Sequence, residues 1–408
     1  MVNTIDLFAG CGGLTEGFNQ SGHYNTIACV EWDKAPCDAL RYNLSNKWKY
    51  IDADKRVIRF DIQRTNQLIK GWKDDDEYGS SDGLDSIVKQ YGESVDLIIG
   101  GPPCQAYSVA GRIRDKDGMK KDYRNYLFES YIKIVEHYKP KAFVFENVPG
   151  ILSAKPGDGE KLIIDTIKER FTESGYVILD DLSQAIIDFT EYGVPQKRSR
   201  IIILALRKEC FDNPEELLSR FYKVVLPSKK VKDKVTVRDA IRDLPALFPL
   251  AKPEKKDGKT YSHSFSTGTI KNHIPRFSSE RDMKVFKILT EDIESGRFEY
   301  VSTDALKRLY TKITGKTSNI HKYHVIRWDE PSNTIPAHLY KDGLRHIHPD
   351  SKQLRTITVR EAARLQTFPD DYEFISGTAL DYKMIGNAVP PLFAKILAEC
   401  IFEQLFNM

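Results

Sequence analysis

Short apolar runs rich in β-branched residues alternate with segments of helical periodicity along the first half of the chain. Apolar side chains recur at helical spacing in residues 125–139 and 161–171, which predicts the buried faces of two helices. Alternation of strands and helices is typical of the α/β class, in which helices cover the faces of a parallel sheet. The strands are predicted at residues 4–8, 26–30, 95–99, 142–146, 176–180 and 200–206.

This alternation is lost after about residue 207. From there to about residue 356 the chain is richer in Lys, Ser, Thr, Pro and His, which indicates a second and less regular domain. The pattern becomes helical again near the end, and we expect the apolar stretch 392–405 to pack back on the first sheet. We therefore predict domains at 1–207 and 208–355, with 356–408 returning to the first domain.

The composition is that of an ordinary soluble protein, with 41% hydrophobic and 29% charged residues. The first residues lead straight into a strand pattern, so we expect no secretory signal. No run approaches the roughly 18 apolar residues of a membrane span. We expect a cytoplasmic protein that does not cross a membrane.

Cysteine and histidine spacing gives no sign of a metal site. The six cysteines include no CxxC pair, so neither a zinc site nor a disulfide framework is indicated. The pairs His321/His324 and His346/His348 are expected at the surface or facing phosphate rather than as ligands, and the second pair is expected to be structural rather than catalytic.

Positive charge is concentrated in the second half of the chain. Residues 208–330 hold 25 Lys and Arg against 18 Asp and Glu, an excess of +7, whereas the whole chain has a net charge of +3. This excess is a modest signal of polyanion binding, and taken alone it is better explained by a solvated surface.

A glycine-rich turn follows the first predicted strand, at Asp6 to Gly13. Such a turn lets backbone amides at a helix start approach a ligand closely, although it lacks the third glycine of the GxGxxG fingerprint. The next strand ends at Glu31, which can accept from ribose hydroxyls, and Trp32 offers a stacking face to adenine. Asp61 can accept from the adenine amino group. These features indicate an adenosine-containing cofactor, with a purely structural turn as the alternative.

A lone thiol, Cys104, follows the apolar run 95–99 and the sequence Gly100-Gly101-Pro102-Pro103. Two prolines restrict the path of the chain, so the thiol is expected on a stiff loop at the carboxyl edge of the sheet, where α/β folds bind ligands. A buried structural cysteine is the alternative. The polar residues beside it, Gln105 and Ser108, favour an exposed thiol.

Five motifs follow one another along the chain: Asp6 to Gly13, Gly101 to Gln105, Glu146-Asn147-Val148, Gln196 to Arg200 and Gly386 to Val389. In this order they resemble the motifs of the C5-cytosine-specific DNA methyltransferase family of bacterial restriction-modification systems. The resemblance implies a Rossmann-like S-adenosylmethionine-dependent methyltransferase domain, and a smaller, irregular target-recognition domain inserted before the C-terminal helix.

The resemblance also implies roles for single residues. Cys104 is the nucleophile, Glu146 its acidic partner, and Arg198 and Arg200 belong to the active-site wall. Tyr107 and Ala106 depart slightly from the family pattern, and the chain does not resemble the tRNA-directed branch. The residues implied to bind S-adenosylmethionine are Phe8, Ala9, Gly10, Gly12, Gly13, Leu14, Glu31, Trp32, Asp61, Ile62, Pro102, Leu127, Asn387 and Val389.

The implied activity is methyl transfer to C5 of a flipped-out cytosine in double-stranded DNA through a covalent Cys104 adduct, without a metal. We expect the basic loop 111–124 to close over the flipped base. DNA would be read within 208–355, with Arg276 a candidate base reader. We further expect a monomer and a cognate restriction endonuclease acting on the same site.

Two other classes of protein share some of these features. A nicotinamide oxidoreductase would share the first turn and Glu31, but it does not explain Cys104, Glu146 and the paired arginines together. A sequence-specific binder without activity would keep the basic domain but is expected to lose Cys104 or Glu146, and both are present.

Overall fold

The computed structural model describes residues 1–103, 127–155, 161–265, 270–317 and 323–407. The chain divides into two compact units. The first unit comprises Met1–Tyr192, Arg198–Lys232 and Ala388–Met408. The second unit comprises Gly193–Lys197 and Asp233–Asn387.

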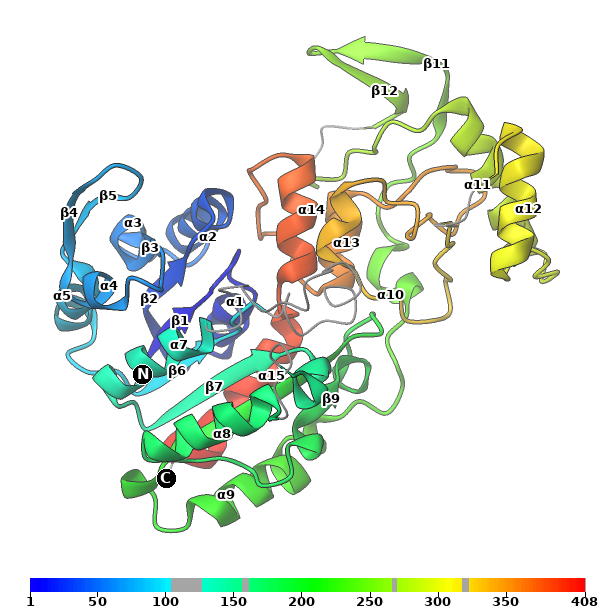
Figure 1. Ribbon diagram of the computed structural model, residues 1–408. Coiled ribbons are helices and arrows are strands. Elements are labelled where there is room, and N and C mark those ends of the chain that lie inside the picture. Colours follow the sequence, from blue (N-terminus) through cyan, green and yellow to red (C-terminus); the bar gives the residue numbers. More distant parts are fainter. Residues whose placement is uncertain (104–126, 156–160, 266–269, 318–322, 408) are drawn as a thin grey trace. The chain divides into compact units, whose positions relative to one another are not determined.

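An eight-stranded sheet forms the centre of the first unit (Figure 1). The strand order is β3-β2-β1-β6-β7-β10-β8, and β9 pairs with β10. Pairing is parallel from β3 to β7, which confirms the predicted α/β class. The strands are β1 (Val2–Leu7), β2 (Tyr24–Glu31), β3 (Val57–Arg59), β6 (Leu97–Gly100), β7 (Ala142–Asn147), β8 (Tyr176–Val177), β9 (Ile186–Asp188) and β10 (Ser199–Arg207).

The last strands are antiparallel, which the sequence pattern did not predict. β10 pairs antiparallel with β7, β8 and β9. Only residues 189–198 connect β9 to β10, and a parallel pair needs a crossover of about a dozen residues or more. The reversal brings the first residues of β10 beside the last residues of β7.

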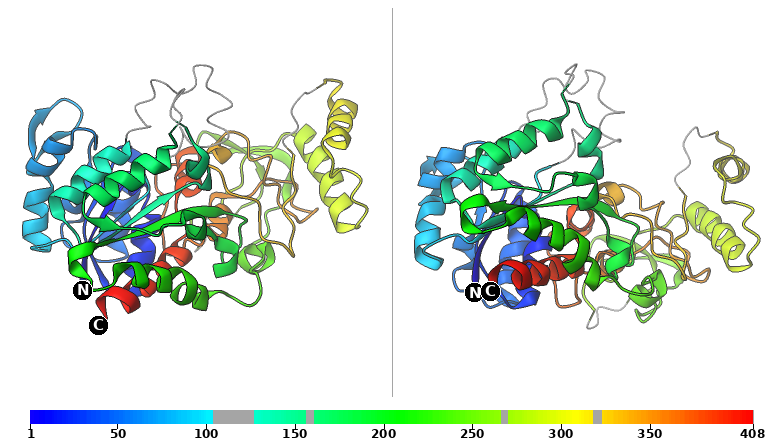
Figure 2. Two further views of the ribbon diagram at one scale, coloured as in Figure 1. Left: turned by 60° about the horizontal axis from the view of Figure 1, so that its bottom comes forward. Right: turned by 90° about the horizontal axis from the view of Figure 1, so that it is seen from below.

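Helices cover both faces of this sheet, with α7 and α8 on one face and α1 and α15 on the other (Figures 1 and 2). A small hairpin of β4 (Trp72–Asp75) and β5 (Gly79–Ser81) also belongs to this unit. The helices are α1 (Gly13–Ser21), α2 (Lys34–Asn46), α3 (Ala53–Arg56), α4 (Thr65–Lys70), α5 (Gly83–Tyr91), α7 (Leu127–Tyr138), α8 (Ile163–Glu173), α9 (Pro214–Arg220) and α15 (Pro391–Ile401).

The C-terminal helix α15 packs on the side of α1 that is formed by the glycines Gly13 and Gly17, which carry no side chains. A Cβ atom built on Gly17 would lie 2.5 Å from the carbonyl oxygen of Pro391 and 2.5 Å from the amide nitrogen of Lys395. The hydroxyl of Tyr24 donates to the carbonyl oxygen of Ala398 at 2.7 Å. The C-terminal residues Ala388–Met408 belong to the first unit, where α1 is the main contact of α15.

One helical stretch, Thr378–Phe406, is long and apolar enough by length and composition to cross a membrane. The sequence analysis did not single it out. The most apolar 18 consecutive residues of this stretch are 61% buried within the protein, as in a core helix. It is therefore weak evidence for a membrane segment.

The second unit holds shorter elements joined by long irregular segments. A two-stranded hairpin turns at Asp257-Gly258, where both residues have positive φ, as a tight two-residue turn requires. Apolar side chains of α11 and α12, with Ile347, form a small core of their own. The elements are α10 (Val237–Ile241), β11 (Pro249–Lys256), β12 (Lys259–His263), α11 (Glu280–Glu294), α12 (Thr303–Thr314), α13 (Val359–Leu365) and α14 (Thr378–Asn387).

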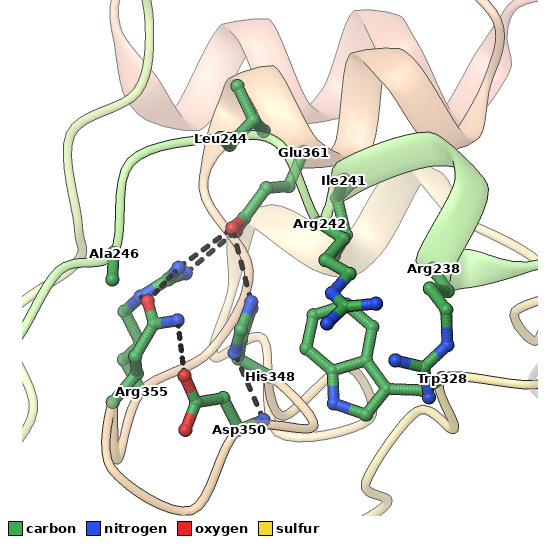
Figure 3. Close-up of a pocket in the computed structure, with 11 residues that line it drawn as sticks. Arg238, Ile241, Arg242, Leu244, Ala246, Trp328, His348, Asp350, Arg355 and Glu361 are labelled. Carbon is green, nitrogen blue, oxygen red and sulfur yellow. Dashed lines mark hydrogen bonds and ion pairs between the residues drawn. The ribbon is translucent and has the colours of Figure 1, made fainter.

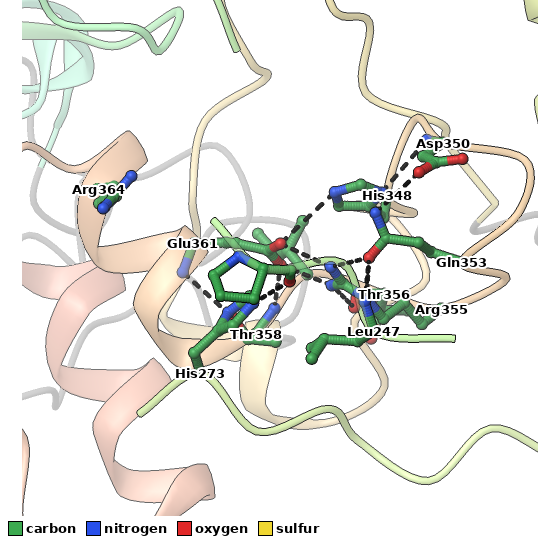
Figure 4. A network of polar contacts seen from close by, with 12 residues as sticks. Leu247, His273, His348, Asp350, Gln353, Arg355, Thr356, Thr358, Glu361 and Arg364 are labelled. Atoms are coloured by element: carbon green, nitrogen blue, oxygen red, sulfur yellow. Dashed lines mark hydrogen bonds and ion pairs between the residues drawn. The ribbon is translucent and has the colours of Figure 1, made fainter. Parts of the chain in front are cut away.

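A buried ion pair lies at the start of α13 (Figure 4). Thr358 and Glu361 form a capping box, in which each side chain binds the other residue's backbone N–H. The Glu361 carboxylate also accepts two hydrogen bonds from the Arg355 guanidinium, both at 2.7 Å. Burial alone would raise the pKa of Glu361, but Arg355 holds it well below its usual range.

Two histidines of the segment before α13, His346 and His348, are buried, contrary to the prediction that they face solvent or phosphate. His346 is 0% and His348 is 2% exposed. Burial lowers the pKa of each imidazole to about 3, so both are neutral near pH 7. Desolvation of a second cation beside Arg355 would be unfavourable, which explains why the ring of His348 stays uncharged.

The compact units do not begin and end where the composition predicted. Residues 208–232 belong with the sheet, because α9 packs on β10 and Tyr222 bonds to the backbone of Leu204 and Ile202. Residues 356–387 belong with the second unit, because α13 packs on α10 and α14. Packing defines these boundaries, whereas polar composition marked only the irregular part of the second unit.

We predict that Gly17→Ala destabilises the protein even though alanine favours a helix. The added methyl group would press on backbone atoms of Pro391 and Lys395, which cannot rotate away. We expect a net loss of about 1–3 kcal/mol in the free energy of unfolding, measured by urea titration. Ser45→Ala at an exposed position of α2 is the control and should be neutral or slightly stabilising. A Gly17→Ala variant as stable as the control would contradict the proposed close packing.

Candidate active site

Four parallel strands of the first unit, β2, β1, β6 and β7, end at one edge of the sheet. The turn after β1, the end of β2, the Gly101-Pro102 segment after β6 and the end of β7 therefore lie along this edge. Most of the residues singled out from the sequence lie here, as the strand-end argument predicted.

The glycine-rich turn after β1 has the conformation that requires glycine. Gly10 and Gly12 have φ values of 55° and 81°, in the left-handed region. Phe8 also has positive φ, and Ala9 donates to the carbonyl oxygen of Val30, which holds the turn against β2. Apart from Gly10 and its two chain neighbours, no atom of the described residues lies within 4 Å of a Cβ built on Gly10, so these residues leave open space beside its backbone.

Glu31 ties this turn to the next helix. One carboxylate oxygen accepts from the amide of Gly10 at 2.8 Å, and the other accepts from the amides of Trp32 and Asp33, both at 2.8 Å. Burial raises the pKa of Glu31, and these hydrogen bonds act in the opposite direction. A carboxylate accepts about four hydrogen bonds, so about one position remains for a ligand hydroxyl.

The next predicted ligand residues lie close to Glu31. Phe60 donates its amide to the carbonyl oxygen of Glu31 at 3.0 Å, and this places Asp61 and Ile62 directly beyond it. The Asp61 carboxylate accepts from the amide of Gln63 at 3.0 Å. Trp32 is 44% exposed, a large fraction for an indole ring. An exposed ring next to Glu31, with Asp61 close by along the chain, suits an adenosine, as the sequence predicted.

Two further predicted residues are almost fully buried. Leu14 is 6% and Leu127 is 3% exposed, and they lie in the first turns of α1 and α7 respectively. Each can offer a cofactor only an apolar contact.

Asp6 and Thr15 form a buried pair beneath the turn, a role that the sequence analysis did not assign. The Thr15 hydroxyl donates to one carboxylate oxygen of Asp6 at 2.6 Å, which joins β1 to α1. Asp6 is 1% exposed, and burial raises its pKa to about 7. The sequence does contain a signal for this role, because Asp6 is a carboxylate inside an apolar strand, directly before a glycine-rich turn.

The chain after β6 is held against the end of β7. The side-chain amide of Asn147 donates to the carbonyl oxygen of Pro102 at 3.2 Å. A Cβ on Gly101 would overlap the carboxylate of Glu146, so a larger residue there would require this carboxylate to shift. Cys104 follows two residues after Pro102 and lies outside the described residues, as does the loop 111–124.

Glu146 and Arg200 form an ion pair at this edge, with 2.9 Å between Oε1 and Nε. Their side chains are only 13% and 17% exposed. The antiparallel pairing of β10 with β7 places Ile202 opposite Glu146. Arg200 lies two residues before Ile202 on the same strand, so its side chain is on the same face of the sheet and reaches Glu146. The structure therefore brings together two residues that the sequence assigned to the same site.

Arg198 contacts a different part of the first unit. It is 3% exposed and donates to the carbonyl oxygen of Ala388 at 3.0 Å. The adjacent Val389 lies against the glycine-rich turn, since a Cβ on Gly13 would clash with the Val389 carbonyl oxygen. Val389 thus joins the predicted cofactor residues, whereas Asn387 belongs to the second unit.

Among the described cysteines, burial disfavours a reactive thiolate. Cys11, Cys29, Cys37 and Cys400 are buried, and Cys210 is partly exposed. Burial raises the pKa of Cys37 and Cys400 to about 12 and that of Cys29 higher still. The described residues also contain no group of three or more His, Cys, Asp or Glu side chains placed to hold a metal ion.

Arg276, a candidate base reader, has a structural role instead. Its guanidinium donates to the carbonyl oxygens of Leu339 and Tyr340. It also lies 3.9 Å from the ring centroid of Tyr382. These contacts occupy the side chain within the second unit, so the sequence-based suggestion that it reads a base is not supported.

A model of the C-5 cytosine-specific DNA methylase family matches residues 2–403. The chain belongs to this family. It is a DNA cytosine-5-methyltransferase, and the match covers both units. The resemblance seen in the five sequence motifs is thereby confirmed.

Relatives of this methylase match along nearly their whole length. Type II methyltransferase M.Bpa9945I of Bacillus paralicheniformis is 35% identical, over 98% of this chain and 98% of the relative. Type II methyltransferase M.DdeI of Desulfomicrobium norvegicum is 32% identical, over 100% of this chain and 90% of the relative. The solved structure of a prophage-encoded E. coli protein, 23% identical, has a TM-score of 0.61 over 100% of both chains and supports the fold.

We predict that Asp6→Asn changes the pH dependence of stability. The folded-state pKa of Asp6 is about 7, against about 3.9 for an unfolded Asp. Between these values the folded protein holds the proton more tightly, so stability falls as pH rises. Relative to the variant, the methylase should lose about 1 kcal/mol of unfolding free energy per pH unit over this range.

Urea unfolding of both proteins at several pH values measures this difference. The asparagine keeps an oxygen that can accept from Thr15, so the variant should fold. A difference between the two proteins that stays constant from pH 4 to pH 7 would show that Asp6 does not titrate abnormally.

Proposed function

We propose that this methylase transfers a methyl group from S-adenosylmethionine to C5 of a flipped-out cytosine through a covalent Cys104 adduct. The observation that carries the proposal is the Glu146–Arg200 pair, set against the Gly101-Pro102 segment that leads to Cys104. In this proposal a partly buried carboxyl group, a guanidinium and the nucleophile would meet at one strand end.

Covalent catalysis follows from the chemistry of cytosine. C5 is too weak a nucleophile to take a methyl group unaided. The Cys104 thiolate adds to C6, forming a C–S bond and pushing an electron pair onto C5. After C5 has been methylated, its proton is lost to a base and the C–S bond breaks, which releases the thiolate.

Glu146 and Arg200 stabilise the charge that develops on the ring. A carboxyl group at N3 of the base donates a proton or a strong hydrogen bond as negative charge builds there. Arg200 holds this carboxyl group in position through its Nε, and its Nη1 donates to the carbonyl oxygen of Ser199, so Nη2 is the nitrogen proposed to face the base or the thiolate. Arg198 holds the Ala388 carbonyl and thereby positions the segment leading to Val389.

The residues at the turn fit S-adenosylmethionine, which supplies the methyl group when bound. The remaining acceptor position of Glu31 would take a ribose hydroxyl, Trp32 would stack on the adenine, and Asp61 would accept from its amino group. The open space beside Gly10 would admit the ligand close to the backbone. The other residues proposed for this site are Phe8, Ala9, Gly12, Gly13, Leu14, Ile62, Pro102, Leu127, Asn387 and Val389.

The substrate in this proposal is duplex DNA. A stacked cytosine is unreachable, so the base must be flipped out of the helix, at a cost of a few kcal/mol. The second unit would choose the target sequence. The relatives named type II methyltransferases support a role in modification, in which methylation protects DNA from a cognate restriction endonuclease. We propose that the methylase acts as a monomer in the cytoplasm.

We predict that Cys104→Ser abolishes methyl transfer, because a hydroxyl is a far weaker nucleophile than a thiolate. Labelled methyl transfer to duplex DNA measures activity. Trapping on DNA that contains 5-fluorocytosine measures the adduct, since fluorine blocks the final elimination. Cys210→Ser, at the partly exposed described cysteine, is the control and should keep both. An adduct with the Cys104→Ser protein would assign the nucleophile to another residue.

We predict that Trp32→Ala weakens S-adenosylmethionine binding by about 1–3 kcal/mol, through loss of stacking and burial. Trp32→Phe keeps an aromatic face and should retain most of the affinity. Calorimetric titration measures cofactor binding, and DNA affinity measured without cofactor should stay unchanged. Equal losses of cofactor and DNA affinity would indicate a folding defect and remove the support for this assignment.

A further inference from the structure

A cavity of about 310 Å³ lies within the second unit (Figure 3). It is lined by α10 and the residues after it, by Trp328, and by part of the segment 348–361. None of these residues takes part in the methyl-transfer site. Pockets that hold small ligands range from about 300 to 1,000 Å³, so this one suits a ligand the size of a single nucleotide.

One wall of the cavity is rigid and has little binding capacity left. All three guanidinium nitrogens of Arg355 donate hydrogen bonds, to Gln353, Glu361 and the carbonyl oxygen of Thr356. The carboxylate of Glu361 is occupied by Arg355 and by the backbone of α13. His348 beside it is buried and neutral.

The opposite side of the cavity carries two arginines with binding capacity. Arg238 and Arg242 are four residues apart on α10 and its C-cap, so they project from the same side of the helix. Arg238 pairs with Asp329, whose side chain is 81% exposed, and a solvated partner of this kind is readily exchanged. The exposed guanidinium of Arg242 has no hydrogen bond or ion pair with any residue that the structure describes.

Trp328 presents an aromatic ring to the same cavity. The Arg238 guanidinium lies 5.5 Å from its ring centroid, and the ring of His348 stands perpendicular to it at 5.4 Å. Arg238 also donates its backbone amide to the carbonyl oxygen of Trp328 at 2.9 Å, which anchors α10 to this segment. Figure 3 shows Arg238, Arg242 and Trp328 together at one side, away from Arg355.

We propose that this cavity binds one nucleotide unit of the DNA, its phosphate held by Arg238 and Arg242 and its base placed against Trp328. Guanidinium groups match the geometry of phosphate oxygens, and an aromatic face binds any base by stacking. A peptide carboxylate would use the arginines but not the ring. The inference rests on the proposed function, because it takes DNA as the ligand.

The test compares DNA binding by Arg242→Gln with binding by Arg220→Gln. Arg220 is an exposed arginine on α9 of the first unit and controls for the loss of one charge. We expect Arg242→Gln to weaken binding to a duplex about 5- to 10-fold and to reduce the log–log salt slope by about 1. The control should leave both close to wild type. If Arg242→Gln matches the control, the phosphate site is refuted.

A second pair of variants tests the aromatic contact. Trp328→Leu should weaken DNA binding about 10-fold without changing the salt slope, and Trp328→Phe should restore most of the affinity. If both variants lose the same affinity, or neither loses any, the ring does not stack on a base and the proposal fails. Thermal melting of each variant shows whether it is folded.

Two measurements separate this inference from related outcomes. For Arg242→Gln, kcat for methyl transfer should be retained while KM for DNA rises. If the wild-type protein itself transfers no methyl group to DNA, the proposed function is refuted instead.

Titration with free dAMP tests the source of the nucleotide. Tight binding of dAMP, with DNA binding of the variants unaltered, would assign the cavity to a free nucleotide and overturn the DNA proposal.

Discussion

The close contact between α1 and α15 is the constraint on which the first unit depends. Gly13 and Gly17 leave no side chain between the two segments, so backbone atoms of Val389, Pro391 and Lys395 come directly against α1. The chain must therefore return to its first helix after it has built the second unit. This return brings the Ala388 carbonyl to Arg198 and Val389 to the glycine-rich turn, so the packing that closes the unit also completes the edge that we propose binds the cofactor.

Carboxylates at three strand ends of the first unit have three different partners, and the partner decides what each can do. Asp6 meets a hydroxyl in a dry environment, and its raised pKa makes it a structural group that titrates near neutrality. Glu31 meets three backbone amides, which leave its carboxyl group little spare capacity to accept further hydrogen bonds. Glu146 meets the guanidinium of Arg200 at the end of β7, an ion pair that suits the proposed role of this carboxyl group at N3 of the base. Strand order alone spaces these groups along one edge.

The second unit differs from the first because it buries an ion pair, Arg355 with Glu361, in its interior. A buried pair such as Arg355 and Glu361 adds little net stability over apolar residues, since both ions lose their hydration. The pair holds its geometry through further hydrogen bonds to Gln353, Thr356 and the start of α13. Such a saturated network is stiff. It therefore gives the neighbouring cavity one rigid wall, and the arginines on the other side remain available to a ligand.

Local patterns determined the parallel core strands, the principal helices, the glycine-rich turn and the family motifs, because each depends on a few neighbouring residues. They also placed Glu31, Asp61 and Glu146 at strand ends. Only the tertiary structure decided the antiparallel strand β10 and hence the contact of Arg200 with Glu146, because strand direction depends on how residues 189–198 are packed. The same holds for the burial of His346 and His348, the inward turn of Arg276 and the unit boundaries. Polar residues look alike in sequence whether they face water or a buried partner, and desolvation, which distinguishes them, arises only when distant segments meet.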